Sequence, residues 1–220
     1  MTIEQNIQNV NQRISRACDR AGRSPDEVTL IAVTKTVDVP AIEAAFAAGI
    51  RNFGENRVQE AIPKIEQLGS LRDKLTWHMI GHLQTNKAKT AADIFDIIHS
   101  IDTIKLAEIL SERSQKKLPV LIEVNVSAET TKHGLLLPGV AEIVKQIGRL
   151  PNLEIEGLMT IAPWESDAEV VRPVFRQLRR LRDSLGLKHL SMGMTDDFEV
   201  AIEEGATLVR VGRAIFGERR

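Results

Sequence analysis

The sequence predicts a parallel (β/α)8 barrel of the TIM type with one extra helix at its N-terminal end. Short apolar segments rich in β-branched residues alternate with helix-compatible segments along the whole chain, and eight such apolar segments can be counted. The 220 residues suffice for one large core but are few for two full domains, so we expect residues 1–220 to form a single domain. A doubly wound open sheet is the alternative.

The first elements are the most clearly marked. Apolar residues recur at steps of three and four from Ile3 onward, which predicts an amphipathic helix that ends near Gly22. The apolar, β-branched run at 28–34 is bounded by Pro25 and Pro40, as is typical of a buried parallel strand.

The same alternation continues to the end of the chain. The other candidate strands lie near residues 51–54, 76–80, 95–99, 119–125, 153–159, 188–192 and 207–211. Helices are expected from about Pro40, Glu55, Asn86, Thr103, Pro138 and Asp197, and the clearest one spans roughly 168–185. In that helix the apolar side consists of Val170, Val174, Leu178, Leu181 and Leu185, and Arg172, Arg179, Arg180 and Asp183 face away. Strands that alternate with helices form right-handed crossovers, and eight of them close into a barrel.

Composition excludes several classes of function. With a formal net charge of −1, the protein lacks the positive electrostatic field that nucleic-acid binding needs. The single cysteine, Cys18, can form neither an intramolecular disulfide nor a thiolate metal cluster, which fits a reducing compartment. No apolar run approaches the length that spans a bilayer, so we expect a cytoplasmic protein. The sequence contains no tyrosine.

Lys35 is the first candidate functional residue. It follows the first predicted strand, at the carboxyl-terminal rim where barrel enzymes place their active sites. Side chains alternate along a strand, so Ile31, Val33 and Lys35 share one face, which would point into the barrel mouth. Desolvation there would increase the neutral amine fraction that attacks a carbonyl to form an imine. A surface lysine that merely follows a strand is the alternative.

The loops after the last two strands predict a phosphate site. Ser191-Met192-Gly193-Met194-Thr195 follows the seventh predicted strand and Gly212 follows the eighth, where barrels commonly bind phosphate. Small residues let backbone N–H groups approach the oxygens, two hydroxyls add donors, and a helix from about Asp196 would direct its positive end at the anion. Glycines after strands are also ordinary turn residues.

Two further polar features have competing interpretations. Arg210 lies in the otherwise apolar last strand, either in a structural ion pair or facing the ring nitrogen of a bound heterocycle, which it would keep unprotonated. His78 and His82 have i,i+4 spacing, but Gly81 and the strand pattern argue against a helical metal site. We therefore expect no metal.

Taken together, these segments resemble the YggS/PROSC family of pyridoxal phosphate homeostasis proteins, which is similar to the N-terminal barrel domain of alanine racemase. The resemblance covers nearly the whole chain. It rests on an ordered set of segments: 32–36, Gly54-Glu55-Asn56, 77–87, Asn125-Val126-Ser127, Gly157-Leu158-Met159-Thr160, 191–194, Arg210-Val211-Gly212 and Ile215-Phe216-Gly217.

The resemblance implies that pyridoxal 5'-phosphate (PLP) is the cofactor, held as a Schiff base on Lys35. It further implies that residues 191–195 and Gly212 hold the phosphate, that Arg210 meets the pyridine nitrogen, and that Asn56, His82 and Met159 lie near the ring. Two departures are visible: Thr195 replaces a common serine, and His133 interrupts the usual Lys-Ser-Gly run after Lys132. A monomer is the family expectation, with PLP-dependent apoenzymes as possible recipients of the cofactor.

The residues favour a carrier over an enzyme. Alanine racemase needs a lysine and a tyrosine base and an additional β-domain, and the sequence has no tyrosine and no residues left for such a domain. An arginine at the ring nitrogen also makes PLP a weaker electron sink. The alternatives are a PLP-dependent amino-acid racemase or decarboxylase, with His82 or another group as second base, and a lysine-imine aldolase that binds a sugar phosphate.

Overall fold

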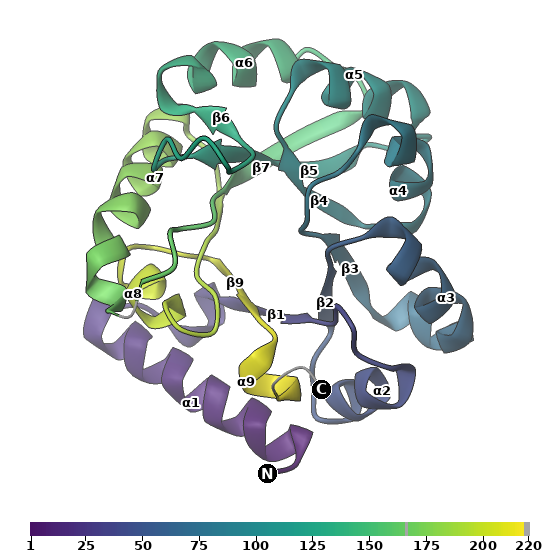
Figure 1. Ribbon diagram of the computed structural model, residues 1–220, viewed down its shortest axis with the longest axis vertical. Coiled ribbons are helices and arrows are strands. Elements are labelled where there is room, and N and C mark those ends of the chain that lie inside the picture. Colours follow the sequence, from purple (N-terminus) through teal and green to yellow (C-terminus); the bar gives the residue numbers. More distant parts are fainter. Residues whose placement is uncertain (166, 218–220) are drawn as a thin grey trace.

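The computed structural model describes residues 1–165 and 167–217. Its strands form a closed, all-parallel barrel, and the helices surround it as an outer ring (Figure 1). The strands of the sheet follow the order β4-β3-β2-β1-β9-β8-β7-β5, and pairing of β4 with β5 closes the ring. The predicted eight-stranded parallel barrel is thereby confirmed, and an open doubly wound sheet is excluded.

The barrel strands are β1 (Thr29–Val33), β2 (Asn52–Glu55), β3 (Thr76–Met79), β4 (Ile97–Ile101), β5 (Leu118–Asn125), β7 (Leu153–Met159), β8 (His189–Ser191) and β9 (Leu208–Val211). The longer helices are α1 (Ile3–Ala21), α2 (Val39–Ala47), α3 (Val58–Leu68), α5 (Ile104–Arg113), α6 (Val140–Ile147) and α7 (Arg172–Leu185). The shorter ones are α4 (Ala88–Ile94), α8 (Phe198–Glu203) and α9 (Arg213–Phe216). None of the helices described is both long and apolar enough to cross a bilayer.

The buried apolar side chains form two separate clusters. A large group fills the layer between the strands and the helices, and includes the α1 residues Ile7, Val10 and Ile14. A small second group, Ile31, Leu121, Met159 and Leu208, comes from four barrel strands and packs inside the ring. Ile31 therefore points inward, as the alternation along the first strand predicted.

The predicted N-terminal helix is α1, and its ends have strong local signals. Thr2 and Gln5 form a capping box at its start, and Gly22 ends it with a left-handed backbone at φ 64°. Along its length α1 packs against α8 and α9, near the other end of the chain (Figure 1). The first helix therefore stabilises α8 and α9 by packing against them.

Four details differ from the expectations. The fourth strand begins at Ile97 and not at residue 95, because Phe95 caps the end of α4. Val170 was expected on the apolar side of α7, but it lies in the preceding 3-10 turn and is 58% exposed. The two-residue strand β6 (Leu135–Leu136), which pairs with β5, and helix α9 were not predicted.

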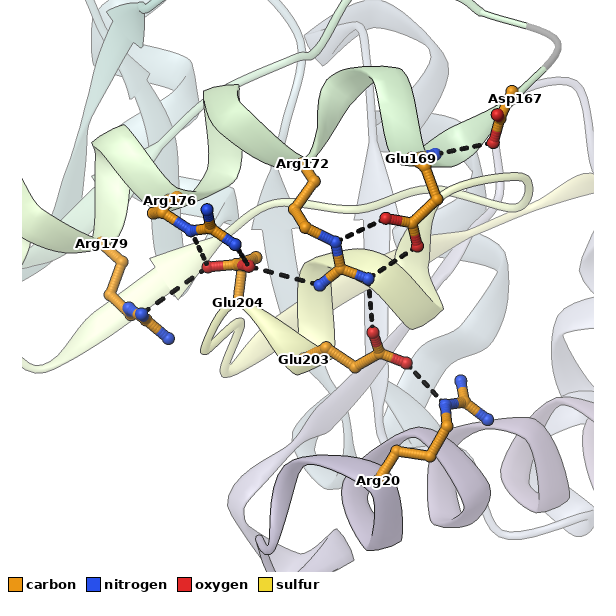
Figure 2. Close-up of polar contacts among 8 residues, drawn as sticks. All are labelled: Arg20, Asp167, Glu169, Arg172, Arg176, Arg179, Glu203 and Glu204. Atoms are coloured by element: carbon orange, nitrogen blue, oxygen red, sulfur yellow. Dashed lines mark hydrogen bonds and ion pairs between the residues drawn. The ribbon is translucent and has the colours of Figure 1, made fainter.

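Arg172 and Arg179, which were expected to face away from the apolar side of α7, form ion pairs with a neighbouring helix. Figure 2 shows both side chains, with Arg176, directed at carboxylates of Glu203 and Glu204 at the end of α8. Glu204 is buried under these contacts, with a side chain that is 5% exposed, whereas Arg176 and Arg179 stay partly exposed. The arginines thus join α7 to α8.

Candidate cofactor site at the carboxyl-terminal rim

Lys35 lies in the turn directly after β1, half-buried, at the rim formed by the carboxyl ends of the strands. β1 pairs with the last strand, β9, with Ala32 opposite Val211. Gly212 continues this register: a Cβ on it would lie 3.3 Å from Val33 Cβ. The close approach brings the residue after the last strand beside the end of the first, two residues before Lys35.

A buried polar cluster fixes the backbone just before Lys35. The Thr34 hydroxyl donates to Glu55 Oε1 at 2.6 Å, and Lys64 Nζ donates to the Thr34 carbonyl at 2.6 Å and to Glu55 Oε1 at 2.7 Å. Burial raises the pKa of Glu55, while the bonds from Lys64 and Thr34 oppose that rise. Thr36, after Lys35, has a left-handed backbone at φ 64°, which strains a β-branched residue. Hydrogen bonds therefore hold the backbone of Thr34, directly before Lys35.

The predicted phosphate loops lie side by side at the same rim. The Arg210 N–H donates to the Gly193 carbonyl at 3.0 Å, which ties the loop after β8 to strand β9. Within the described residues, the backbone N–H groups of Gly193, Thr195 and Gly212 have no hydrogen-bond partner. Unpaired amide donors at adjacent positions form a concave group suited to an anion. The Met194 N–H is already bonded to Asp197 Oδ1 at 2.5 Å.

Gly193 is required by the conformation of its loop. Its φ is +90°, and a Cβ there would lie 2.6 Å from Ala201 Cβ and 2.8 Å from Phe198 Cα. The loop therefore packs directly on α8, which no larger residue permits. Met192 is fully buried and Met194 is 39% exposed, so these two side chains point in different directions.

Arg210 points into the barrel and is 4% exposed. Its Nη1 donates to Ser191 Oγ at 2.5 Å and its Nη2 donates to the Thr160 carbonyl at 2.9 Å. No described carboxylate forms a salt bridge with it. Burial lowers the pKa of Arg210 to about 10, opposed by the charges of Asp197 and Glu123. The guanidinium remains charged at neutral pH.

Ser191, expected as a phosphate donor, uses its hydroxyl inside the barrel. It begins a chain of hydrogen bonds that sequence reasoning missed: Ser191 Oγ to His99 Nδ1 at 2.9 Å, His99 Nε2 to His78 Nδ1 at 2.9 Å, and His78 Nε2 to Asn52 Oδ1 at 3.0 Å. Burial lowers the pKa of His78 to about 4 and that of His99 well below its ordinary value. Both rings are thus neutral at pH 7.

Neutral rings fix the direction of every bond in this chain. Because Asn52 Oδ1 can only accept, His78 Nε2–H donates to it, and each ring then accepts at Nδ1 and donates from Nε2. The Ser191 hydroxyl therefore donates to His99 and accepts from Arg210. The chain holds Arg210 in one orientation.

Of the three residues expected near the ring, Asn56 and His82 line one cavity and Met159 lies elsewhere. Met159 is fully buried in the apolar cluster inside the barrel. Asn56 lines a cavity of about 550 Å³ formed by the loops after β2 and β3, and His82 lines both that cavity and a second one of about 180 Å³. Their contacts with a cofactor remain predictions.

His82 also belongs to a cluster that the sequence did not indicate. Its Nδ1 lies 3.1 Å from Asp102 Oδ2, and its ring stacks on that of His133 with centroids 3.8 Å apart. His78, in contrast, points into the barrel, so the i,i+4 pair does not converge. Nearby, burial and then the charge of Asp102 raise the pKa of Glu123 to about 7. The loops after β3, β4 and β5 supply this cluster.

Comparison with known proteins identifies the family of this chain. The family model of the alanine racemase N-terminal domain matches residues 3–220. The pyridoxal phosphate homeostasis protein of Aquifex aeolicus is 46% identical over 229 residues, covering 100% of both chains. PipY of Synechococcus elongatus, solved with PLP bound, is similar with a TM-score of 0.82 and 38% identity, over 93% of this chain and 100% of that one.

More distant structures share the fold alone. Alanine racemase from Corynebacterium glutamicum has a TM-score of 0.68 at 17% identity, and the match spans 99% of this chain but 61% of that enzyme. The similarity to curated relatives, in contrast, runs from end to end at high identity. The chain therefore belongs to the family of pyridoxal phosphate homeostasis proteins, whose barrel is that of the alanine racemase N-terminal domain.

Proposed function

We propose that this protein binds PLP as a Schiff base on Lys35 and serves in intracellular PLP homeostasis as a carrier with little or no catalytic turnover. The proposal depends on one observation: at one rim, a lysine after β1 lies near three backbone amides after β8 and β9 that have no partner among the described residues. PLP offers an aldehyde and a phosphate, which are the two groups that such a rim would bind. Relatives named for PLP homeostasis, and PipY with PLP bound, support it.

The residues present fit the cofactor group by group. The backbone N–H groups of Gly193, Thr195 and Gly212 would donate hydrogen bonds to the phosphate, with the Thr195 hydroxyl as a further donor. Arg210 would face the pyridine nitrogen, and Ser191 would act by orienting Arg210 and not by touching phosphate. Asn56, His82, Met159, Met192 and Met194 would border the ring and the loop.

Arg210 is also the reason to propose a carrier. PLP, when bound to an enzyme, supplies an electron sink whose strength depends on a protonated ring nitrogen. Arg210 is charged at neutral pH and has donors only, so it would leave that nitrogen unprotonated. The chain also contains no tyrosine, so it lacks the second base of the alanine racemase mechanism.

The remaining parts of the proposal concern context. We place the protein in the cytoplasm, where its one cysteine, Cys18, stays reduced; that thiol is free and buried. We further propose that residues 1–220 act as one domain and as a monomer, and that PLP-dependent apoenzymes receive the cofactor.

The test is borohydride reduction of the purified protein followed by peptide mapping. We expect the label on Lys35. Lys35→Ala should lose covalent attachment and the visible absorption of the Schiff base but keep phosphate-dependent affinity for PLP. Lys89→Ala, which removes an exposed lysine of α4, is the matched control and should behave as the wild type. A label on another lysine would overturn the assignment.

Turnover is tested separately with a panel of amino acids. We expect neither racemisation nor decarboxylation at rates above those of free PLP. Stereochemical or product assays that detect multiple turnovers would instead identify an enzyme. A colourless protein that binds sugar phosphates would identify an aldolase.

A further inference from the structure

Three side chains that could share a metal ion meet beside the proposed cofactor site. His82 follows β3, Asp102 follows β4, and His133 lies between β5 and β6, on three neighbouring loops of the rim. One nitrogen or oxygen atom from each lies within 4.8 Å of the other two. Nothing in the proposed carrier function requires that these three residues converge.

The chemistry of this group is that of a transition-metal site. Two imidazoles and one carboxylate suit Zn²⁺ and related divalent ions, and leave coordination positions open for water or a ligand. Asp102 is held near the site, since its side chain is only 10% exposed and lies 3.1 Å from His82 Nδ1. A ligand already contacted by a neighbour loses less freedom on binding.

A second observation points to a cation in the same place. Glu123 is 5% exposed, and its Oε2 is buried without any hydrogen-bond partner within the described residues. Glu123 lines the cavity of about 180 Å³ together with His82 and His133, and the nearby Asp102 adds negative charge. Lys132 lines this cavity too, but its ammonium is bonded to Glu129 at 2.7 Å. An unpaired buried carboxylate is costly unless a positive group compensates it.

The observed ring positions require one adjustment for binding. The rings of His82 and His133 are nearly parallel, with 10° between their planes. A metal ion lies close to the plane of each ring that binds it, so one ring must rotate out of the stack. Both histidines are exposed, at the surface of the protein.

We propose that His82, Asp102 and His133 bind one divalent transition-metal ion, with Zn²⁺ as the ion that this ligand set fits best, and that Glu123 contributes negative charge behind it. This proposal replaces the expectation of no metal, which rested on the spacing of His78 and His82. It does not depend on the binding of PLP.

The experiment is titration of the chelator-treated, dialysed full-length protein with Zn²⁺ by isothermal calorimetry. We expect one equivalent to bind. His82→Ala, His133→Ala and Asp102→Asn should each weaken binding about tenfold or more. Thr130→Ala, which changes an exposed residue in the same loop as His133, is the matched control and should bind as the wild type. Zn²⁺ should also raise the melting temperature of the wild type more than that of His133→Ala.

Two results would refute the metal site: no saturable one-to-one binding by the wild type, or unchanged affinity in both histidine variants. Lys35→Ala separates this proposal from the carrier function, because that variant should bind Zn²⁺ as the wild type does. Zn²⁺ binding without a borohydride label would support the metal site and refute the Schiff base on Lys35. A label without Zn²⁺ binding would support the Schiff base and refute the metal site.

Discussion

Arg172 in the outer ring of helices and Arg210 in the barrel interior carry the same charge, but in different surroundings. On the outside, Arg172 of α7 bonds to Glu169, Glu203 and Glu204 at 2.6–3.2 Å, and Glu203 also binds Arg20 of α1 (Figure 2). These bonds, with Glu169 first, raise the pKa of Arg172. Inside the barrel, Arg210 bonds to a hydroxyl and a carbonyl, and burial lowers its pKa.

The difference indicates which arginine is structural. Carboxylates neutralise the charge of Arg172, and the ion pairs connect α7 to α8 and α8 to α1. Arg210 has a buried charge to which no carboxylate of the described residues is bonded, and this is costly in a structure that has no use for the charge. At the base of the proposed cofactor site, a positive group that is not neutralised would be able to act on a ligand.

Replacement of Arg210 tests this distinction most strongly. Arg210→Met removes the charge at the proposed ring nitrogen and should weaken PLP binding about 100-fold, since a hydrogen bond to a charged group contributes roughly 1.5–3 kcal/mol. Equilibrium dialysis of PLP checks this, with circular dichroism to confirm that the variant is folded. An affinity equal to that of the wild type would mean that Arg210 is as structural as Arg172.

A substitution in the loop after β8, which is proposed to bind phosphate, leaves both arginines in place. It tests whether PLP affinity depends on the loop as well as on Arg210. Gly193→Ala introduces a Cβ that clashes with α8 at a backbone with φ +90°. We expect it to cost about 2 kcal/mol of stability and to weaken binding of PLP and of inorganic phosphate. Chemical denaturation and phosphate competition measure these effects.

The matched control for that loop is Gly22→Ala. Gly22 has a similar left-handed backbone, at φ +64°, but no atom lies within 4 Å of the position of its Cβ. This variant should lose some stability and no affinity. Equal loss of affinity in both variants would show that the effect of Gly193→Ala is not local.

The smallest expected effect concerns Arg172 and acid. The pKa of Glu204 is lowered: burial alone would raise it, but the hydrogen bonds from Arg176 and Arg172 outweigh burial. The pKa of Glu169 is lowered by its bonds to Arg172. Carboxyls with depressed folded pKa values stabilise the protein above their ordinary pKa of about 4.5, and this stabilisation disappears as the pH falls below it.

Arg172→Met should therefore lose about 1 kcal/mol at neutral pH, with unchanged PLP affinity. The loss should shrink as the pH falls below about 4, where the wild type also loses the ion pairs. Urea denaturation at several pH values provides the comparison. Arg180→Met, at an exposed position of the same helix, should show neither effect; a pH-independent loss in Arg172→Met would contradict the assignment.

The sequence predicted the barrel well because its signals are local. Each apolar run corresponds to a strand, and Gly22 marks the end of α1. The errors occur where a local pattern is ambiguous. Phe95 is apolar and lies next to a strand, yet it packs at the end of α4; Val170 continues the helical period but lies in the turn before the helix.

The site was predicted only in outline. The position of Lys35 beside the loops proposed to bind phosphate follows from the order of the strands, because adjacent strands end at the same rim. The partners of Arg210 and Ser191 do not follow, since His99 lies on a distant strand and only closure of the barrel brings it within reach. His82, Asp102 and His133 come from separate loops, and no spacing in the sequence indicates that they meet.

The pairing of β1 with β9 has a consequence for the synthesis of this protein. Lys35 is synthesised well before Gly193, Arg210 and Gly212. A nascent chain therefore displays the amine before the amides and the guanidinium exist around it. If these groups bind PLP as proposed, full affinity for PLP requires that the ring of strands has closed.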